Sequence, residues 1–127
     1  MATVELSESN FESTILEGGI VFVDFWAEWC GPCRAFGPIY GAASEANDDI
    51  VFGTVDTDAH QQLSAALNIQ SIPTLMIFRD GIGVFAQAGA LPRAALDDLI
   101  GQVRALDMDA VRAEIESSAA ERARETA

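Results

Sequence analysis

The sequence predicts an α/β fold, with a central mixed β-sheet flanked by helices on both faces. Strand-like apolar runs first alternate with segments of helical periodicity, which predicts parallel strand neighbours. An Asp80-Gly81 turn between two later apolar runs then predicts a β-hairpin, and hence an antiparallel pair. The chain has 127 residues, half of them hydrophobic, which suffices for one domain with a buried core.

The N-terminal part is expected to form a strand and then a helix. Val4 to Leu6 is a short strand candidate. Either Ser7 or Ser9 can cap the following helix, because a serine oxygen accepts from the free amides of a first turn. Gly18-Gly19 should end that helix after Glu17.

The next segment carries the most apolar strand. Ile20 to Ala27 is nearly continuous in β-branched and aromatic residues, which is typical of a strand covered on both faces. A helix is expected from about Arg34 to Asn47, and a further strand from Ile50 to Val55. Cys30 and Cys33 therefore fall at a strand-to-helix junction.

The second half adds one more helix before the hairpin and one after it. Asp58 to Leu67 is expected to be helical, and Thr74 to Phe78 to be a strand. The Asp80-Gly81 turn should lead into a strand from Val84 to Ala88. Leu91 to Leu106 has an apolar stripe at helical spacing and is expected to close the fold.

The composition changes at residue 107. Residues 1–106 are expected to form the domain, and residues 107–127 an acidic extension rich in Ala, Glu and Arg. We expect this extension to be a short helix with a frayed end. Asp107 can cap a new helix, or the preceding helix can continue, and the apolar pattern does not choose between them.

The charge argues against two classes of partner. The net charge is −13, and all seven basic residues are arginines with no basic stripe, so neither nucleic acid nor an anionic membrane surface is an expected partner. No apolar run approaches the roughly 20 residues of a membrane-spanning helix. Residues 1–12 lack the basic start and apolar core of a secretory signal, so we expect a cytoplasmic location.

Only two cysteines occur, three residues apart, and they must be explained together. A structural zinc site normally takes four Cys or His ligands, and His60 is the one histidine, so zinc would require a second chain. A lone Cys-x-x-Cys in this strand-then-helix setting instead indicates a redox pair. The expected redox-active group is thus a Cys30–Cys33 disulfide, with no bound cofactor and no metal.

Three runs together give the chain a resemblance to the thioredoxin family over roughly residues 3–106. They are Asp24-Phe25-Trp26-Ala27-Glu28-Trp29-Cys30-Gly31-Pro32-Cys33, Ser71-Ile72-Pro73-Thr74 and Gly89-Ala90. The resemblance implies a protein-disulfide reductase that acts on protein disulfides, is recycled by an NADPH-dependent thioredoxin reductase and is expected to be a monomer. Gly31-Pro32 between the cysteines resembles the reducing members, whereas disulfide isomerases and oxidases typically carry a histidine there.

The position of each cysteine predicts its role. Residues three apart on a first helical turn lie about 5 to 6 Å apart, which a disulfide can span. Cys30 lies at the helix entrance, where free amides and the helix dipole favour a thiolate and lower the thiol pKa. We therefore expect Cys30 to be the nucleophile, and Cys33, one turn further in and more buried, to resolve the mixed disulfide.

Asp24 is the third catalytic candidate. Burial in an apolar strand would raise the pKa of its carboxyl group, but a strand-end or solvent-facing Asp fits the pattern equally well. The family resemblance favours a proton acceptor for Cys33, acting through a water. The family commonly has a lysine on the neighbouring strand, where this chain has Thr54, so we expect Asp24 to titrate higher than in its relatives.

The resemblance also implies a shallow peptide groove lined by Trp29, Ile72, Pro73, Gly89 and Ala90. It places a cis bond before Pro73, although trans is the ordinary expectation for an X-Pro bond. Ile72 and Ala90 can equally serve packing alone. Gly89 fits either close backbone approach or an ordinary bulge.

Two other functions remain open from the sequence. A binding module would use the same surface, with Met108 to Ile115 as the contact segment and redox turnover incidental. An oxidase or isomerase would use the same cysteines at a more oxidising potential.

Overall fold

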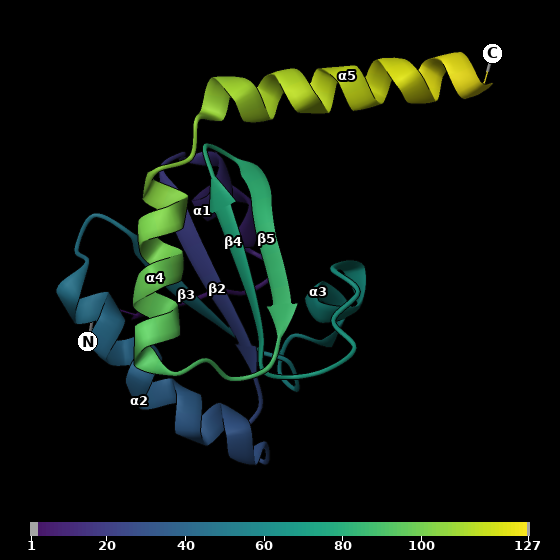
Figure 1. Cartoon of the computed structure of the whole chain (residues 1–127). Coiled ribbons are helices and arrows are strands. Elements are labelled where there is room, and N and C mark those ends of the chain that lie inside the picture. Colours follow the sequence, from purple (N-terminus) through teal and green to yellow (C-terminus); the bar gives the residue numbers. More distant parts are fainter. Residues whose placement is uncertain (1–2, 127) are drawn as a thin grey trace.

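The computed structural model describes residues 3–126, and Figure 1 shows a twisted sheet with helices on both of its faces. The strands are β1 (Thr3–Glu5), β2 (Ile20–Trp26), β3 (Val51–Asp56), β4 (Thr74–Arg79) and β5 (Ile82–Ala88). The helices are α1 (Phe11–Leu16), α2 (Gly31–Ala46), α3 (Gln61–Ala66), α4 (Arg93–Arg104) and α5 (Met108–Thr126).

The sheet is mixed, as predicted, with strand order β1-β3-β2-β4-β5. β3 pairs in parallel with β1 and β2, while β4 pairs antiparallel with β2 and β5. The hairpin turn lies where expected, with positive φ angles at Asp80 and Gly81 that a two-residue turn of this kind requires. β2 is therefore the central strand, with neighbours on both edges and helices over both faces.

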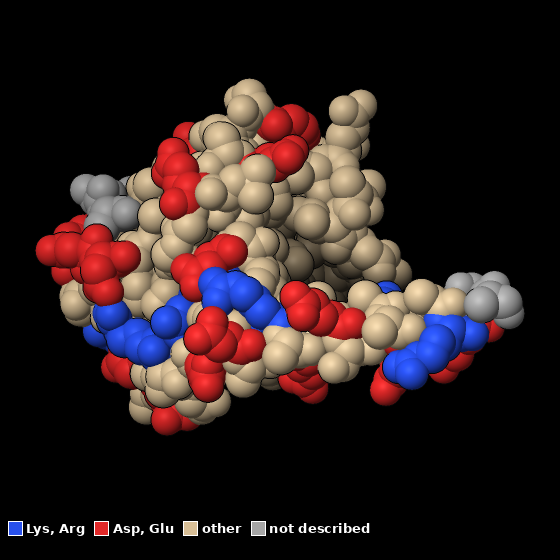
Figure 2. All heavy atoms as spheres, turned by 90° about the horizontal axis from the view of Figure 1, so that it is seen from above, with Lys and Arg blue, Asp and Glu red and all other residues tan. Residues whose placement is uncertain are grey.

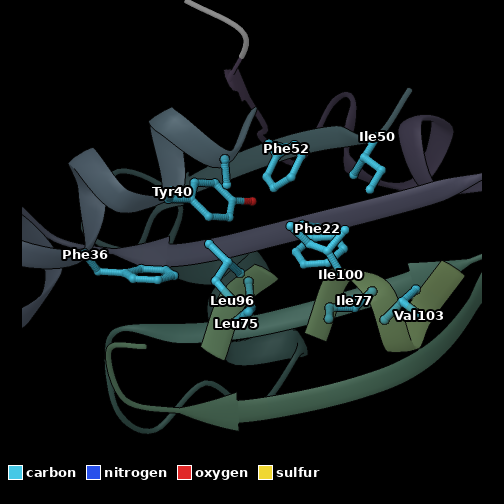
Figure 3. Packing of buried hydrophobic residues seen from close by; sticks show 11 residues of the cluster. Phe22, Phe36, Tyr40, Ile50, Phe52, Leu75, Ile77, Leu96, Ile100 and Val103 are labelled. Atoms are coloured by element: carbon cyan, nitrogen blue, oxygen red, sulfur yellow. The ribbon is translucent and has the colours of Figure 1, made fainter. Parts of the chain in front are cut away.

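Each face of the sheet has its own apolar core. Figure 3 shows the core beneath α2 and α4, where Phe22 of β2 and Phe52 of β3 meet Tyr40 of α2 and Leu96 of α4. The opposite face packs against α1, with Val21, Val23 and Phe25 of β2 in its core. Alternate β2 side chains thus enter opposite layers, which explains the unbroken apolar run predicted for this strand.

The predicted starts of α2 and α3 were wrong. α3 begins at Gln61 and not at the predicted Asp58. α2 begins at Gly31, three residues before the predicted Arg34, because the Cys33 amide donates to Cys30 Sγ at 3.2 Å and Cys30 caps the helix. The cap of α1 also differs. Asn10 precedes α1 and makes no side-chain cap bond to it, and Ser7 Oγ instead accepts from the Ser9 amide in the preceding turn.

The C-terminal extension is a separate helix and is not short. α5 has 19 residues and projects away from the rest of the fold (Figure 1). It starts anew at Met108 because Asp107 Oδ1 accepts from the amides of Asp109 and Ala110. Met108 is buried, with 7% of its surface exposed, whereas Ile115 further along is 45% exposed.

Acidic and basic side chains lie beside one another on the face that includes α5 (Figure 2). Arg104 pairs with Asp49, and Arg112 contacts both Asp80 and Asp109 at 3.3 Å. Among the described residues, no helix combines the length and the apolar character needed to cross a membrane.

Candidate active site

The two cysteines form a disulfide at the junction between β2 and α2. Their Cα atoms lie 5.2 Å apart, in agreement with the predicted spacing. The chain leaves the buried strand at Trp26, and a short loop brings Cys30 to the start of α2. Pro32 fits in the first turn because proline has no amide to leave unpaired there.

The two sulfur atoms face different surroundings although the two residues are equally buried. Cys30 is 5% and Cys33 4% exposed, so the expected difference in exposure is not present at the level of whole residues. Cys30 Sγ lies 3.8 Å from the Ile72 carbonyl oxygen, next to the loop before β4. Cys33 instead lines a partly open cavity between α2 and the sheet. The two sulfur atoms therefore belong to residues that border different hollows of the surface.

Asp24 is buried in β2, with 3% of its surface exposed. Its Oδ1 atom is also buried, and no hydrogen-bond partner within the described chain reaches it. Burial disfavours the carboxylate and raises the Asp24 pKa to about 7. Of the two alternatives open from the sequence, the structure therefore supports a buried carboxyl group over a strand-end or solvent-facing one.

A cavity of about 530 Å³ joins Asp24 to the disulfide. Asp24, Cys33, Tyr40 and Thr54 all contribute to its wall. Thr54 of β3 lies directly opposite Asp24 of β2 in the parallel register, which is the neighbouring-strand position expected for it. The Tyr40 hydroxyl donates to the Gly53 carbonyl oxygen at 2.7 Å, and burial, with a smaller contribution from Asp24, raises the Tyr40 pKa well above its ordinary value.

Trp29 and Ile72 lie together on the outer surface. Trp29 is 67% exposed, and its Nε1 donates to Asp58 Oδ2 at 2.9 Å, which fixes the indole beside the disulfide. Both residues line a shallow pocket of about 310 Å³. The Ile72-Pro73 peptide bond is cis, as the family resemblance implied and against the ordinary expectation for such a bond.

Gly89 and Ala90 belong to the loop after β5, which contacts the loop that contains Pro73. The Gly89 amide donates to the Pro73 carbonyl oxygen at 2.8 Å, so the loop after β5 lies against the proline loop. Gly89 has φ +109°, a conformation that favours glycine, and no atom of the described chain lies within 4 Å of a Cβ built there. The positive φ therefore explains why a glycine occupies position 89. The bulge alternative is not supported, because the irregularity in the pairing of β4 with β5 lies at Ile77/Phe78. In the described chain, the lining of the pocket beside Trp29 includes neither Pro73, Gly89 nor Ala90.

Sequence reasoning missed several residues of the site. Asp58, which holds Trp29, carries no local signal because it lies 29 residues away. Glu5 reaches the Asp24 cavity only through the pairing of β1 with β3. Gly37 and Gly41 could have been noticed, because two glycines one turn apart within a helix leave one side of it without side chains.

Sequence comparison places the same residues in a known family. The Thioredoxin family model matches residues 2–102. Putative thioredoxin 2 of Streptomyces coelicolor is 60% identical over 111 residues, which are 87% of this chain and 83% of that protein. Thioredoxin C-3 of Corynebacterium nephridii is 39% identical over 100 residues, covering 78% of this chain and 69% of that one.

Structural comparison agrees. A thioredoxin of Plasmodium falciparum superimposes with a TM-score of 0.71 at 36% identity, over 77% of this chain and 96% of that one. A mutant thioredoxin from Halobacterium salinarum gives a TM-score of 0.76 at 29% identity, over 83% and 93% of the two chains. A five-stranded mixed sheet and a cysteine pair at disulfide distance accompany this match. The chain therefore belongs to the thioredoxin family of thiol–disulfide oxidoreductases.

Proposed function

We propose that this oxidoreductase works as a reductant of protein disulfides, with Cys30 as nucleophile and Cys33 as resolving thiol. One observation carries the assignment of roles. Cys30 caps the N-terminus of α2, where the Cys33 amide points at its sulfur. An amide and a helix dipole directed at Sγ stabilise a thiolate there, which lowers the thiol pKa of Cys30 in the reduced protein.

The proposed reaction transfers two electrons to the target. The Cys30 thiolate attacks one sulfur of a target disulfide, which breaks the S–S bond and releases the other target sulfur as a thiolate. The Cys33 thiol then loses its proton and attacks Cys30 Sγ, which releases the second target thiolate. The protein leaves with the Cys30–Cys33 disulfide, and the released thiolates take up protons.

Asp24 is the proposed acceptor of the Cys33 proton. It lines the same cavity as Cys33, and a pKa of about 7 suits a group that exchanges protons near neutral pH. The transfer is proposed to run through a water in that cavity. Gly31 and Pro32 hold the two cysteines in the first turn of α2.

The outer surface is the proposed target site. Trp29 and Ile72 would contact an extended stretch of the target chain on either side of Cys30, with backbone pairing at Ile72. Pro73, Gly89 and Ala90 would extend this groove along the loop joined by the Gly89 amide.

We also propose a domain organisation, a recycling enzyme and a cellular location for the protein. Residues 1–106 would be the catalytic domain and residues 107–127 an appendage to it. An NADPH-dependent thioredoxin reductase, which is typical for this family, would restore the dithiol. We propose that the protein acts as a cytoplasmic monomer without bound metal, nucleic acid or membrane.

Insulin reduction coupled to a thioredoxin reductase and NADPH tests the function. Wild-type protein should support continuous NADPH oxidation, and Cys30→Ser should abolish it. Cys33→Ser should accumulate a mixed disulfide with the target through Cys30, visible by non-reducing electrophoresis. A mixed disulfide trapped instead by Cys30→Ser would reverse the assigned roles.

The same assay separates the rival functions. A binding module would retain its partner in the Cys30→Ser, Cys33→Ser double variant and would not turn over insulin. An oxidase or isomerase would have a strongly oxidising potential in equilibrium with glutathione, which a reductant cannot have.

A further inference from the structure

The cavity beneath α2 contains a row of polar side chains that the proposed reaction does not use in full. Glu5, Thr54 and Asp24 lie at matching positions on β1, β3 and β2 and all line the cavity. Neighbouring strands are about 4.8 Å apart, so the backbones at Glu5 and Asp24 are roughly 10 Å apart, with Thr54 between them. The floor of the cavity is therefore acidic at both ends.

The roof of the cavity is open because α2 carries glycines there. Gly37 and Gly41 lie one turn apart on the lining, and no atom of the described chain lies within 4 Å of a Cβ built at either. A glycine inside a helix is less favourable than an alanine. Two such residues on the lining leave room for a guest in the cavity that Asp24 also lines.

The charges around the cavity favour a cation. Asp24 Oδ1 is buried without a partner in the described chain, so it is an acceptor without a donor. Arg34 also lines the cavity, but its side chain is exposed and directed to the Glu28 carbonyl oxygen at 3.5 Å. The whole chain has a net charge of −13, which attracts cations in general.

The remaining walls decide which cation fits. Trp26 and Tyr40 line the cavity with aromatic surface, which suits an alkyl chain. One carboxyl group and one hydroxyl at the inner end are too few oxygen ligands for Ca²⁺, which takes six to eight. An ammonium group instead brings three hydrogen-bond donors, which can serve Asp24 and Thr54 together.

We propose that this cavity binds a short aliphatic ammonium ion, with its charged group paired to Asp24 and its alkyl chain against Trp26 and Tyr40. Such a guest binds the carboxylate form of Asp24 and not the neutral acid. Occupancy therefore lowers the Asp24 pKa from its value of about 7. The other titratable or charged groups that line the cavity are Glu5 on β1 and Cys33, Arg34 and Tyr40 on α2.

The oxidised protein is the suitable form for the test, because its disulfide removes the Cys33 thiol from the titration. The probe is n-butylammonium chloride, and the Asp24 carboxyl carbon is followed by NMR between pH 5 and 9. At a concentration ten times the dissociation constant, the Asp24 pKa should fall by about one unit. Sodium chloride at equal ionic strength should leave that pKa unchanged, and n-butanol should cause no such fall.

Matched glycine variants locate the binding. Gly41→Leu fills the cavity from α2 and should abolish the shift. Gly101→Leu makes the same change on an exposed turn of α4, where a Cβ also meets nothing within 4 Å, and should preserve the shift. Amide spectra of both variants establish that they are folded.

A third variant needs no titration of Asp24. In Asp24→Asn the probe should no longer perturb the amide signals of Thr54 and Gly41, because the charge that holds it is gone. The proposal is overturned if the Asp24 pKa does not move in the wild type, if Gly41→Leu retains the shift, or if n-butanol reproduces it.

Discussion

β2 and α5 differ sharply in how deeply their side chains are buried. β2 has five consecutive buried residues, from Val21 to Phe25, between helices on both faces. Within the described part of α5, Met108 alone is buried. An acid in β2 therefore has a strongly raised pKa, whereas acids along α5 stay exposed to water. Substitutions should have large effects near β2 and small effects along α5.

Asp24→Asn should give the largest change in stability. The folded-state pKa of about 7 lies above the ordinary 3.8, so the folded protein loses stability as the pH rises between these two values. A gap of about three units corresponds to roughly 4 kcal/mol. Urea unfolding of the oxidised protein should therefore show the variant to be more stable at pH 8.5 by up to about 4 kcal/mol.

The pH dependence provides the control for this substitution. Near pH 3.5 the wild-type carboxyl group is mostly protonated in both states, so the advantage of the variant should largely vanish. Insulin reduction by the same variant should be slower between pH 6 and 9, because Cys33 loses its proton acceptor. An equal rate in the variant across this range would remove Asp24 from the mechanism.

Met108→Ala should have the next largest effect, and it tests the one place where α5 resembles the core. Removing a buried methionine side chain leaves a cavity and should lower the free energy of unfolding by about 2 kcal/mol. Ile115→Ala, at an exposed position on the same helix, should cost less than about 0.5 kcal/mol. Equal losses for the two variants would contradict the contrast drawn between them.

Thr54→Lys should change the environment of Asp24 from within the sheet. The two residues lie directly opposite one another and share the cavity, so a lysine ammonium can reach the carboxylate. The Asp24 pKa should fall by about one unit, as measured by NMR. Thr54→Met, of similar length but uncharged, should leave that pKa raised. If both variants lower it equally, charge is not the cause.

Deletion of residues 116–127 should have the smallest effect. The side chains of residues 116–125 are all exposed, so their removal gives up little apolar burial. We expect the free energy of unfolding to change by less than about 0.5 kcal/mol and insulin reduction to be unchanged. A clear loss of reduction would assign this segment a part in catalysis.

The strands of the fold were predictable because their signals are local. The apolar run of β2 and the Asp80-Gly81 turn each identify an element from a few adjacent residues. The start of α2 was predicted too late, since a cysteine is not an ordinary capping residue and its sulfur became the cap only in the folded loop. α5 was underestimated because its sparse apolar residues form no stripe.

The candidate site likewise has one part that local sequence predicts and one part that it does not. Cys30 and Cys33, and their place at a strand-to-helix junction, follow from one short run of sequence. The Asp24 cavity does not, because Thr54 and Glu5 reach it only through the register of two parallel pairings. Local patterns do not determine which residues of separate strands become neighbours.

Arg79 joins the sheet to the corner between α4 and α5. From the end of β4, its Nη1 donates to the carbonyl oxygens of Val103 and Leu106, both at 2.8 Å, at the corner between α4 and α5. β4 begins at Thr74, directly after the cis Pro73 beside the disulfide. A mechanical load on the C-terminal helix would reach α4 through the backbone and β4 through these hydrogen bonds of Arg79. The hydrogen bonds that β4 makes to β2 and β5 run across the strand, so they would resist the load together, in shear.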